Sequence, residues 1–249
     1  MPLTQTPPDD PGTAEDDWQR WGTRFPDLDL RECKRLVVVA PHPDDETVGV
    51  GGLMATCVEH RIPVAPVAVT DGEASHPDYP PWPPPTLARM RIAEMHGALT
   101  TLGVAAAPVR LGLPDGDVAG HQPALATALT NLLSDAPADT WCAATWRGDG
   151  HPDHDAVGRA AAIACRAADV RLLEYPIWMW HWARPGDPSI PWAHARSVPL
   201  TPQSHLAKLT AIRSFRSQTE PPPAAPDLPP VLPGHILAHW RRPHETVFA

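Results

Sequence analysis

Several residue types are scarce in this 249-residue chain, and each scarcity excludes a class of protein. The four cysteines stand singly with no CxxC spacing, so we expect them to be reduced and buried rather than part of a disulfide framework. Basic residues number 20 against 29 acidic ones, and no basic tract is present, which argues against a nucleic-acid partner. No apolar run is long enough to span a membrane, and the first residues lack the pattern of a secretory signal. We therefore expect a cytoplasmic protein.

Proline and tryptophan are abundant, with 34 prolines and 10 tryptophans against 2 tyrosines and 3 phenylalanines. The prolines gather in residues 77–85 and 221–233, where regular helix or central strand is excluded, so both stretches are predicted to be ordered surface loops or lids. Trp178, Trp180 and Trp182 alternate as in a strand that shows one face. Core packing and a sugar-stacking wall both fit this alternation.

Strand and helix patterns alternate through the middle of the chain. Continuous apolar runs predict strands over residues 36–40, 64–70, 108–111, 139–146 and 171–175. Helical patterns cover residues 46–59, 87–102, 122–134 and 153–168, followed by 203–217, and residues 235–248 fit either a strand or a short helix. This order predicts a Rossmann-like three-layer α/β fold with a mainly parallel sheet and a Trp/Pro-rich C-terminal lid region. We expect an N-terminal extension over 1–34 and a single catalytic domain over 35–249.

Two short polar runs follow predicted strands: Pro41-His42-Pro43-Asp44-Asp45-Glu46 and His151-Pro152-Asp153-His154-Asp155. In proteins with a parallel sheet, ligands bind beyond the carboxyl ends of the strands, and both runs lie there. Within each run, two side chains able to bind a metal are three residues apart and can reach one ion. Two histidines and one carboxylate leave a fourth position on zinc for water, which the metal makes available as hydroxide near neutral pH. Spacing alone leaves open whether Asp44 or Asp45 is the ligand.

The combination of HPDDE and a downstream HPDH resembles the LmbE/PIG-L family of zinc-dependent N-acetylglucosaminyl deacetylases, over roughly residues 35–220. The resemblance implies one zinc ion per chain, held by His42, Asp45 and His154. It further implies the roles of the neighbouring residues, with Asp44 as general base, His151 polarising the tetrahedral intermediate and Asp153 orienting His151. Asp153 would also suit the start of the following helix. Arg91 and Asp115 match positions that resemble substrate-binding residues of the family.

These observations predict a hydrolase that removes an N-acetyl or similar acyl group from an amino sugar or sugar conjugate. The alternatives are an amidase acting on a thiol-sugar or other amide conjugate, and a non-catalytic zinc-containing carbohydrate-binding protein. A phosphoesterase fits less well, because such enzymes usually use two metals and more carboxylates. The expected partner is a small N-acylated molecule, and the sequence leaves open whether the chain forms a homo-oligomer. The glycines of residues 49–52 are expected to serve helix packing, and His235, His239 and His244 are expected at the surface or in a lid.

Overall fold

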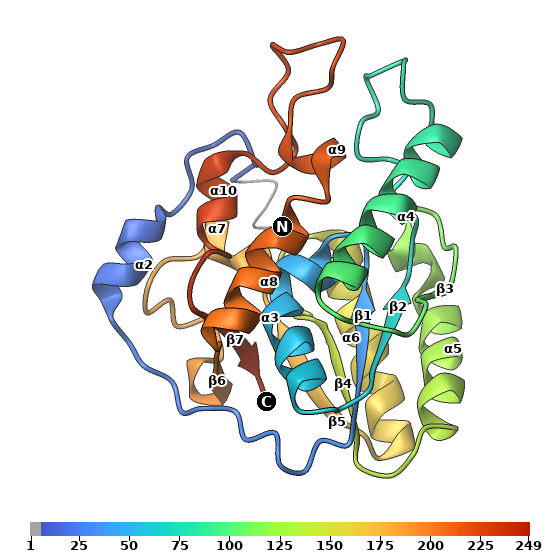
Figure 1. Cartoon of the computed structure of the whole chain (residues 1–249), viewed down its shortest axis with the longest axis vertical. Coiled ribbons are helices and arrows are strands. Elements are labelled where there is room, and N and C mark those ends of the chain that lie inside the picture. The colour runs from blue at the N-terminus through green and yellow to red at the C-terminus, as the bar shows by residue number, and fades with distance from the viewer. Residues whose placement is uncertain (1–5) are drawn as a thin grey trace.

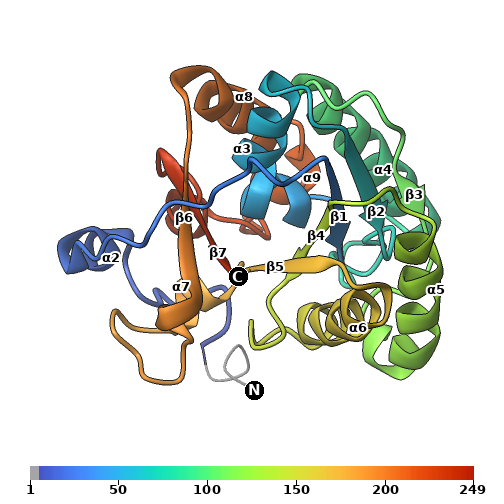
Figure 2. The ribbon, with the colours of Figure 1, turned by 90° about the horizontal axis from the view of Figure 1, so that it is seen from below.

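The computed structural model describes residues 6–249, which form one seven-stranded sheet with helices on both faces (Figures 1 and 2). The strand order is β3-β2-β1-β4-β5-β7-β6. Strands β1 to β5 pair in parallel, whereas β7 is antiparallel to both of its neighbours, β5 and β6. The strand bounds are Arg35–Ala40, Val64–Ala68, Val109–Arg110, Thr140–Thr145, Arg171–Tyr175, Ala195–Pro199 and His244–Phe248. The predicted fold class, with its mainly parallel sheet, is confirmed.

Three long helices cover one face of the sheet and two cover the other (Figure 2). The first group is α3 (Asp45–Glu59), α4 (Pro84–Thr101) and α8 (Pro202–Ile212); the second is α5 (Gln122–Ser134) and α6 (Pro152–Ala168). Shorter elements complete the chain: α2 (Glu15–Trp21), η1 (Val118–His121), α7 (Met179–Trp182), η2 (Trp192–His194), α9 (Arg216–Thr219) and α10 (Gly234–Ala238).

Strand β1 shows why the sequence forms a sheet that is buried on both sides. Leu36 and Val38 belong to the core beneath α3 and α4, whereas Val37 and Val39 belong to the core beneath α5 and α6. Successive side chains of a strand point to opposite faces, so a continuous apolar run suits a sheet with helices on both sides.

The C-terminal third differs in detail from the sequence-based expectation. Residues 178–182 lie at and within helix α7, not in a strand, because a period-two pattern over five residues is also compatible with one helical turn. The terminal segment contains both elements that were considered, α10 and β7. His239 is buried rather than exposed, and its Nδ1 lies 2.9 Å from the Glu15 carboxylate. The proline-rich stretches are loops that project side by side at the top of Figure 1, where the Ala224 N–H donates to the Tyr79 hydroxyl. The expectation was wrong for Pro84 and Pro85, which begin helix α4, because a proline in the first turn of a helix lacks only an N–H that would have no partner there.

The segment before β1 packs against the C-terminal third of the chain. Trp18 is buried, and its Nε1–H donates to the carbonyl of Trp180. The Thr13 N–H donates to the carbonyl of His181, so the packing begins upstream of α2. The boundary at residue 34 between extension and catalytic domain stays a prediction. None of the helices between residues 6 and 249 combines the length and apolar character that a membrane crossing requires.

Candidate metal centre

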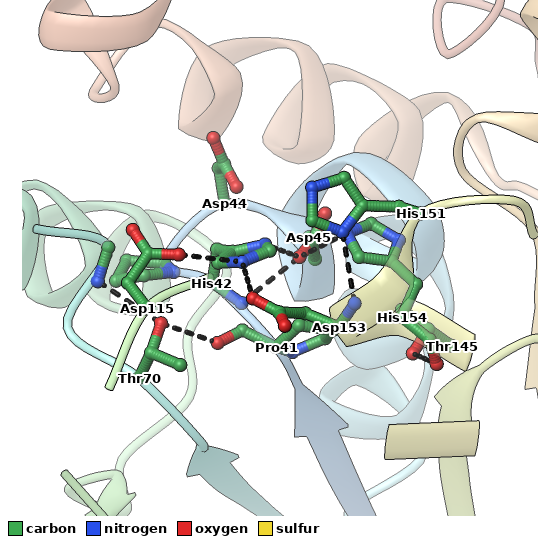
Figure 3. A network of polar contacts seen from close by, with 12 residues as sticks. Pro41, His42, Asp44, Asp45, Thr70, Asp115, Thr145, His151, Asp153 and His154 are labelled. Atoms are coloured by element: carbon green, nitrogen blue, oxygen red, sulfur yellow. Dashed lines mark hydrogen bonds and ion pairs between the residues drawn. The ribbon is translucent and has the colours of Figure 1, made fainter. Parts of the chain in front are cut away.

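The two polar runs meet because the strands that precede them are neighbours. β1 and β4 pair in parallel, so the loops that follow them leave the same edge of the sheet. His42 lies in the loop after β1, and Asp45 is the first residue of α3. His151 is the N-cap of α6, and His154 lies in the first turn of that helix. Figure 3 shows these side chains converging above the strand ends.

Three of the converging side chains have the geometry of a metal site. Asp45 Oδ2 lies 3.1 Å from Nδ1 of His42 and 3.3 Å from Nε2 of His154. Ligand atoms on a tetrahedral zinc ion, with bonds of about 2.0–2.1 Å, are about 3.4 Å apart. An overlapping set, His42, His151 and Asp153, also has ligand atoms within 4.8 Å of one another. The group can therefore hold a metal ion, with His42 common to both sets.

The second ring nitrogen of each predicted histidine ligand faces a carboxylate. Nδ1 of His154 lies 2.8 Å from Asp149 Oδ2, and Nε2 of His42 lies 3.1 Å from Asp115 and 3.2 Å from Asp153. Metal-bound histidines usually have such a partner, which fixes the orientation of the ring. This pattern favours the set of His42, Asp45 and His154. The remaining ring nitrogens, Nδ1 of His42 and Nε2 of His154, both lie close to Oδ2 of Asp45.

Asp149 was not predicted from the sequence. Its carboxylate is fully buried and accepts hydrogen bonds from the backbone N–H groups of Ile177, Trp178 and Met179, in addition to facing His154. The only sequence signal is an acidic residue five positions before a predicted ligand. Its partners at 177–179 come from another strand end, so spacing could not identify them.

The charge of the site also fits a cation. Five carboxylates are buried around it, namely those of Asp44, Asp45, Glu46, Asp149 and Asp153. Arg91, by contrast, is the only buried arginine among residues 6–249. Burial opposes a charge on His154, yet Asp45 and Asp149 outweigh that effect and raise its pKa to about 9. The site therefore favours positive charge, and a metal ion would displace the protons that otherwise supply it.

Asp44 is held in an unusual conformation beside the metal group. Its φ of 137° is rarely adopted by residues with a side chain, and such strain is typical of functional positions. Burial raises the pKa of the Asp44 carboxyl to about 7, although the Arg91 guanidinium opposes the increase. In Figure 3 its carboxylate stands apart from the network that joins His42 and Asp45. Asp44 is therefore a buried carboxyl group separate from the three candidate metal ligands.

Arg91 and Asp115 both contact residues of the two polar runs. Arg91 donates to the carbonyls of Gly72 and Pro43 and, over 3.1 Å, to the carboxylate of Asp44. Asp115 Oδ2 accepts from the N–H of Ala74 while Oδ1 faces His42. Both residues also line a pocket that opens onto His42, Asp45 and His154, and their predicted contacts with substrate stay predictions.

The Asp153 carboxylate faces His42 and accepts from the N–H groups of Gly116 and Val118, and its backbone N–H donates to Nδ1 of His151. The orientation of His151 thus comes from the backbone of Asp153, and His151 itself caps α6. The His151 ring centroid is 5.2 Å from that of His42 and 4.7 Å from that of His154. Burial and the two neighbouring histidines lower the pKa of His151 to about 3.

Fold and site together define an α/β protein with a metal-binding centre at the carboxyl edge of a parallel sheet. Residues 37–165 match the family described as "PIG-L: GlcNAc-PI de-N-acetylase", which is about half of the chain. The chain belongs to the PIG-L family, and the resemblance seen in the sequence is confirmed.

Two curated relatives carry deacetylase names. The chain is 28% identical over 177 residues to "1D-myo-inositol 2-acetamido-2-deoxy-alpha-D-glucopyranoside deacetylase" of Tsukamurella paurometabola, covering 58% of the chain and 59% of the relative. It is 30% identical over 134 residues to "Probable N-acetyl-alpha-D-glucosaminyl L-malate deacetylase 2" of Bacillus subtilis, covering 53% of the chain and 60% of the relative. The matches span about three fifths of each relative.

Among solved structures, "N,N'-diacetylchitobiose deacetylase from Pyrococcus horikoshii" superimposes with a TM-score of 0.57. The match covers 78% of the chain and 73% of the other protein, at 21% sequence identity. The likeness extends the shared fold beyond the segment matched by the family.

Proposed function

We propose that the chain is a zinc-dependent hydrolase that removes an N-acetyl or similar short acyl group from an amino sugar or sugar conjugate. One observation carries the proposal: the group of His42, Asp45 and His154 shares a pocket with a separate buried carboxylate, Asp44. The names of the two curated relatives support an N-acetylated glucosamine derivative as the substrate class. The active unit in this proposal is a single catalytic domain over residues 35–249, in the cytoplasm, with one zinc ion per chain.

The residues around the metal group suit hydrolysis of an amide. A zinc ion held by His42, Asp45 and His154 would polarise the amide carbonyl and lower the pKa of water. Asp44 would accept a proton from the attacking water, and the hydrogen bond that Arg91 donates to its carboxylate supports this role. The amide C–N bond breaks as a C–O bond to the water oxygen forms, and the proton passes to the leaving amine. The products are a carboxylate and a free amino group.

His151 suits the stabilisation of the developing oxyanion. Because its Nδ1 accepts from the Asp153 N–H, the ring proton resides on Nε2, which can donate to an oxygen in the pocket. His151 lines this pocket together with Asp44. A fixed donor at such a position is typically worth about 10²–10³ in kcat.

The test is the zinc content of the protein, measured together with release of free amine from a panel of N-acetylated glucosamine derivatives and a simple N-acetylated amine. Wild type is compared with Asp44→Asn and with Asp117→Asn. The second variant is a matched control, because Asp117 is exposed and follows Asp115 and Gly116, which line the pocket. We expect one zinc per chain in all three proteins and a loss of about 10²–10⁴ in turnover for Asp44→Asn alone. Bound zinc and sugar without amine release by wild type would favour the non-catalytic binding protein. Turnover of the simple amide alone would favour a different amidase.

A further inference from the structure

The pocket at the metal group has two chemically different parts. Its volume is about 300 Å³, within the range of small-molecule sites. One part carries the metal group together with Asp44, Asp115 and Arg91. The other part is formed by apolar side chains, namely Val48, Ile177, Trp178, Val231, Leu232 and Trp240. A substrate that reaches the metal therefore also meets an apolar wall.

Most of this apolar wall comes from outside the segment that matches the family. Five of the six residues lie between 177 and 240, whereas the match ends at residue 165. Pro8, from the segment before α2, also lines the pocket. All of the wall residues except Val231 also belong to the buried core, and the surface that they turn toward the pocket is available to the part of a ligand that does not react.

The wall is held in place by backbone hydrogen bonds. The N–H groups of Ile177 and Trp178 donate to the buried carboxylate of Asp149, which also faces the metal ligand His154. The Leu232 N–H donates to the carbonyl of Gln218 and closes the base of the second proline-rich loop. The apolar surface is thus built before a ligand arrives.

Sugar hydroxyls would find few partners along this wall. The six wall side chains offer two polar groups, the indole N–H donors of Trp178 and Trp240, and no acceptor; in the part of the chain that the structure describes, the buried Trp240 Nε1–H has no hydrogen-bond partner. A hydroxyl buried against aliphatic carbon loses its bonds to water, whereas an apolar group placed there gains from leaving water. The wall consequently favours an apolar group of the ligand over additional hydroxyl groups.

We propose that the substrate is an N-acylated amino sugar that carries an apolar group, alkyl or aryl, which packs on the wall formed by Ile177, Trp178, Val231 and Leu232. This assignment rests on the deacylase activity proposed above. The apolar group belongs either to an acyl chain longer than acetyl or to an aglycone on the sugar, and both sources share the same chemistry.

The experiment measures kcat/KM for amine release by the zinc-loaded full chain on three substrates. N-acetylglucosamine is the reference, N-hexanoylglucosamine places the apolar group on the acyl side, and hexyl N-acetylglucosaminide places it on the aglycone. We expect a gain of about tenfold or more over the reference for one of the two hexyl-bearing substrates. The substrate with the gain identifies the source of the apolar group.

Two variants tie the gain to the wall. Val231→Ser introduces a hydroxyl at a half-buried wall position, and the gain over the reference should fall at least threefold. Leu228→Ser changes an exposed leucine of the same loop that does not line the pocket, and the gain should not change. The comparison of the three substrates needs wild type only. It therefore tests the proposed apolar group even if Val231→Ser is poorly folded.

The possible failures are distinguishable. Equal kcat/KM values for all three substrates, within twofold, would overturn the apolar assignment and leave the deacylase proposal standing. A lower kcat/KM for both hexyl-bearing substrates would do the same. Absence of amine release from every substrate by zinc-loaded wild type would overturn both proposals.

Discussion

The carboxylate of Asp149 lies 2.8 Å from Nδ1 of His154, and both side chains are almost completely buried. The same carboxylate accepts three backbone N–H groups from residues 177–179, the segment that leads into α7. One side chain therefore fixes both a predicted metal ligand and the beginning of the pocket wall.

Replacing Asp149 by Asn should weaken metal binding. The amide cannot match the carboxylate in orienting the His154 ring, and loss of such a partner typically costs 10- to 100-fold in metal affinity. Competition between apo-protein and a chromophoric chelator for zinc measures the effect. Asp155→Asn is the matched control, because Asp155 accepts the Gly150 N–H in the same loop without contacting the His154 ring. Unchanged zinc affinity in Asp149→Asn, with lower thermal stability, would limit Asp149 to a structural role.

Arg91→Lys should lower kcat by about 10- to 100-fold and leave KM nearly unchanged. Lysine has no planar fork and cannot donate at once to Gly72, Pro43 and Asp44, so Asp44 loses its fixed position. Steady-state kinetics on an N-acetylated sugar give both parameters. Arg89→Lys, on the exposed side of the same helix, should change neither. If KM rises tenfold at constant kcat, Arg91 acts mainly by contacting the substrate.

Glu245→Gln should destabilise the protein by about 3–5 kcal/mol, since it leaves the buried ammonium of Lys208 without a counter-charge. Glu245 also accepts the N–H groups of Gly52 and Leu53, just after helix α3 departs from helical geometry at Val50. Lys208→Met leaves the buried Glu245 carboxylate without its counter-charge but keeps these two hydrogen bonds, which partly stabilise the carboxylate, so this change should cost less.

Urea unfolding of both variants measures the difference in stability. Arg216→Gln breaks the exposed ion pair with Glu220 and should change stability by less than about 1 kcal/mol. An equal cost for Glu245→Gln and Lys208→Met would show that the contacts with α3 contribute little.

Glu15 should make stability depend on pH below about pH 5. Burial alone would raise its pKa, but hydrogen bonds from His239 and Arg242 dominate and lower it to about 2, against 4.5 for an ordinary glutamate. The resulting stabilisation, on the order of 2 kcal/mol, is complete above the pKa of the unfolded chain and is lost as the pH falls toward 2. The difference in unfolding free energy between wild type and Glu15→Gln should therefore shrink from pH 5 to pH 2.

The control for this pH dependence is Asp29→Asn. The Asp29 carboxylate is exposed and paired with Arg31, and the same measurement should give a smaller difference because water and salt screen the pair. Equal behaviour of the two variants would contradict a special role for the buried cluster around Glu15.

The sequence predicts the parallel part of the sheet and the metal group because both depend on local patterns. Continuous apolar runs mark β1 and β4, and the two polar runs that contain His42 and His154 come after the ends of these strands. Once the strands are neighbours, the two motifs necessarily meet. The short N-terminal helix α2 could not be predicted in this way. Trp18 is its one buried side chain, so its sequence has no repeating apolar pattern.

The rest of the site depends on contacts between distant residues. Asp149 reaches residues 177–179, and Asp153 faces His42, 111 positions away. The predicted strand at 178–182 is a helical turn whose first N–H groups bond to Asp149, a contact that no local pattern encodes. The insertion of β7 between β5 and β6 is likewise a pairing of segments far apart in sequence.

The two proline-rich loops beside the pocket bear on how a ligand is bound. They are joined by the hydrogen bond from Ala224 to the Tyr79 hydroxyl, and the second is closed at its base by Leu232 and Gln218. Proline removes backbone freedom from the chain before any encounter. Binding at this wall therefore loses little conformational entropy, so recognition is close to lock-and-key and needs no ordering of a loop.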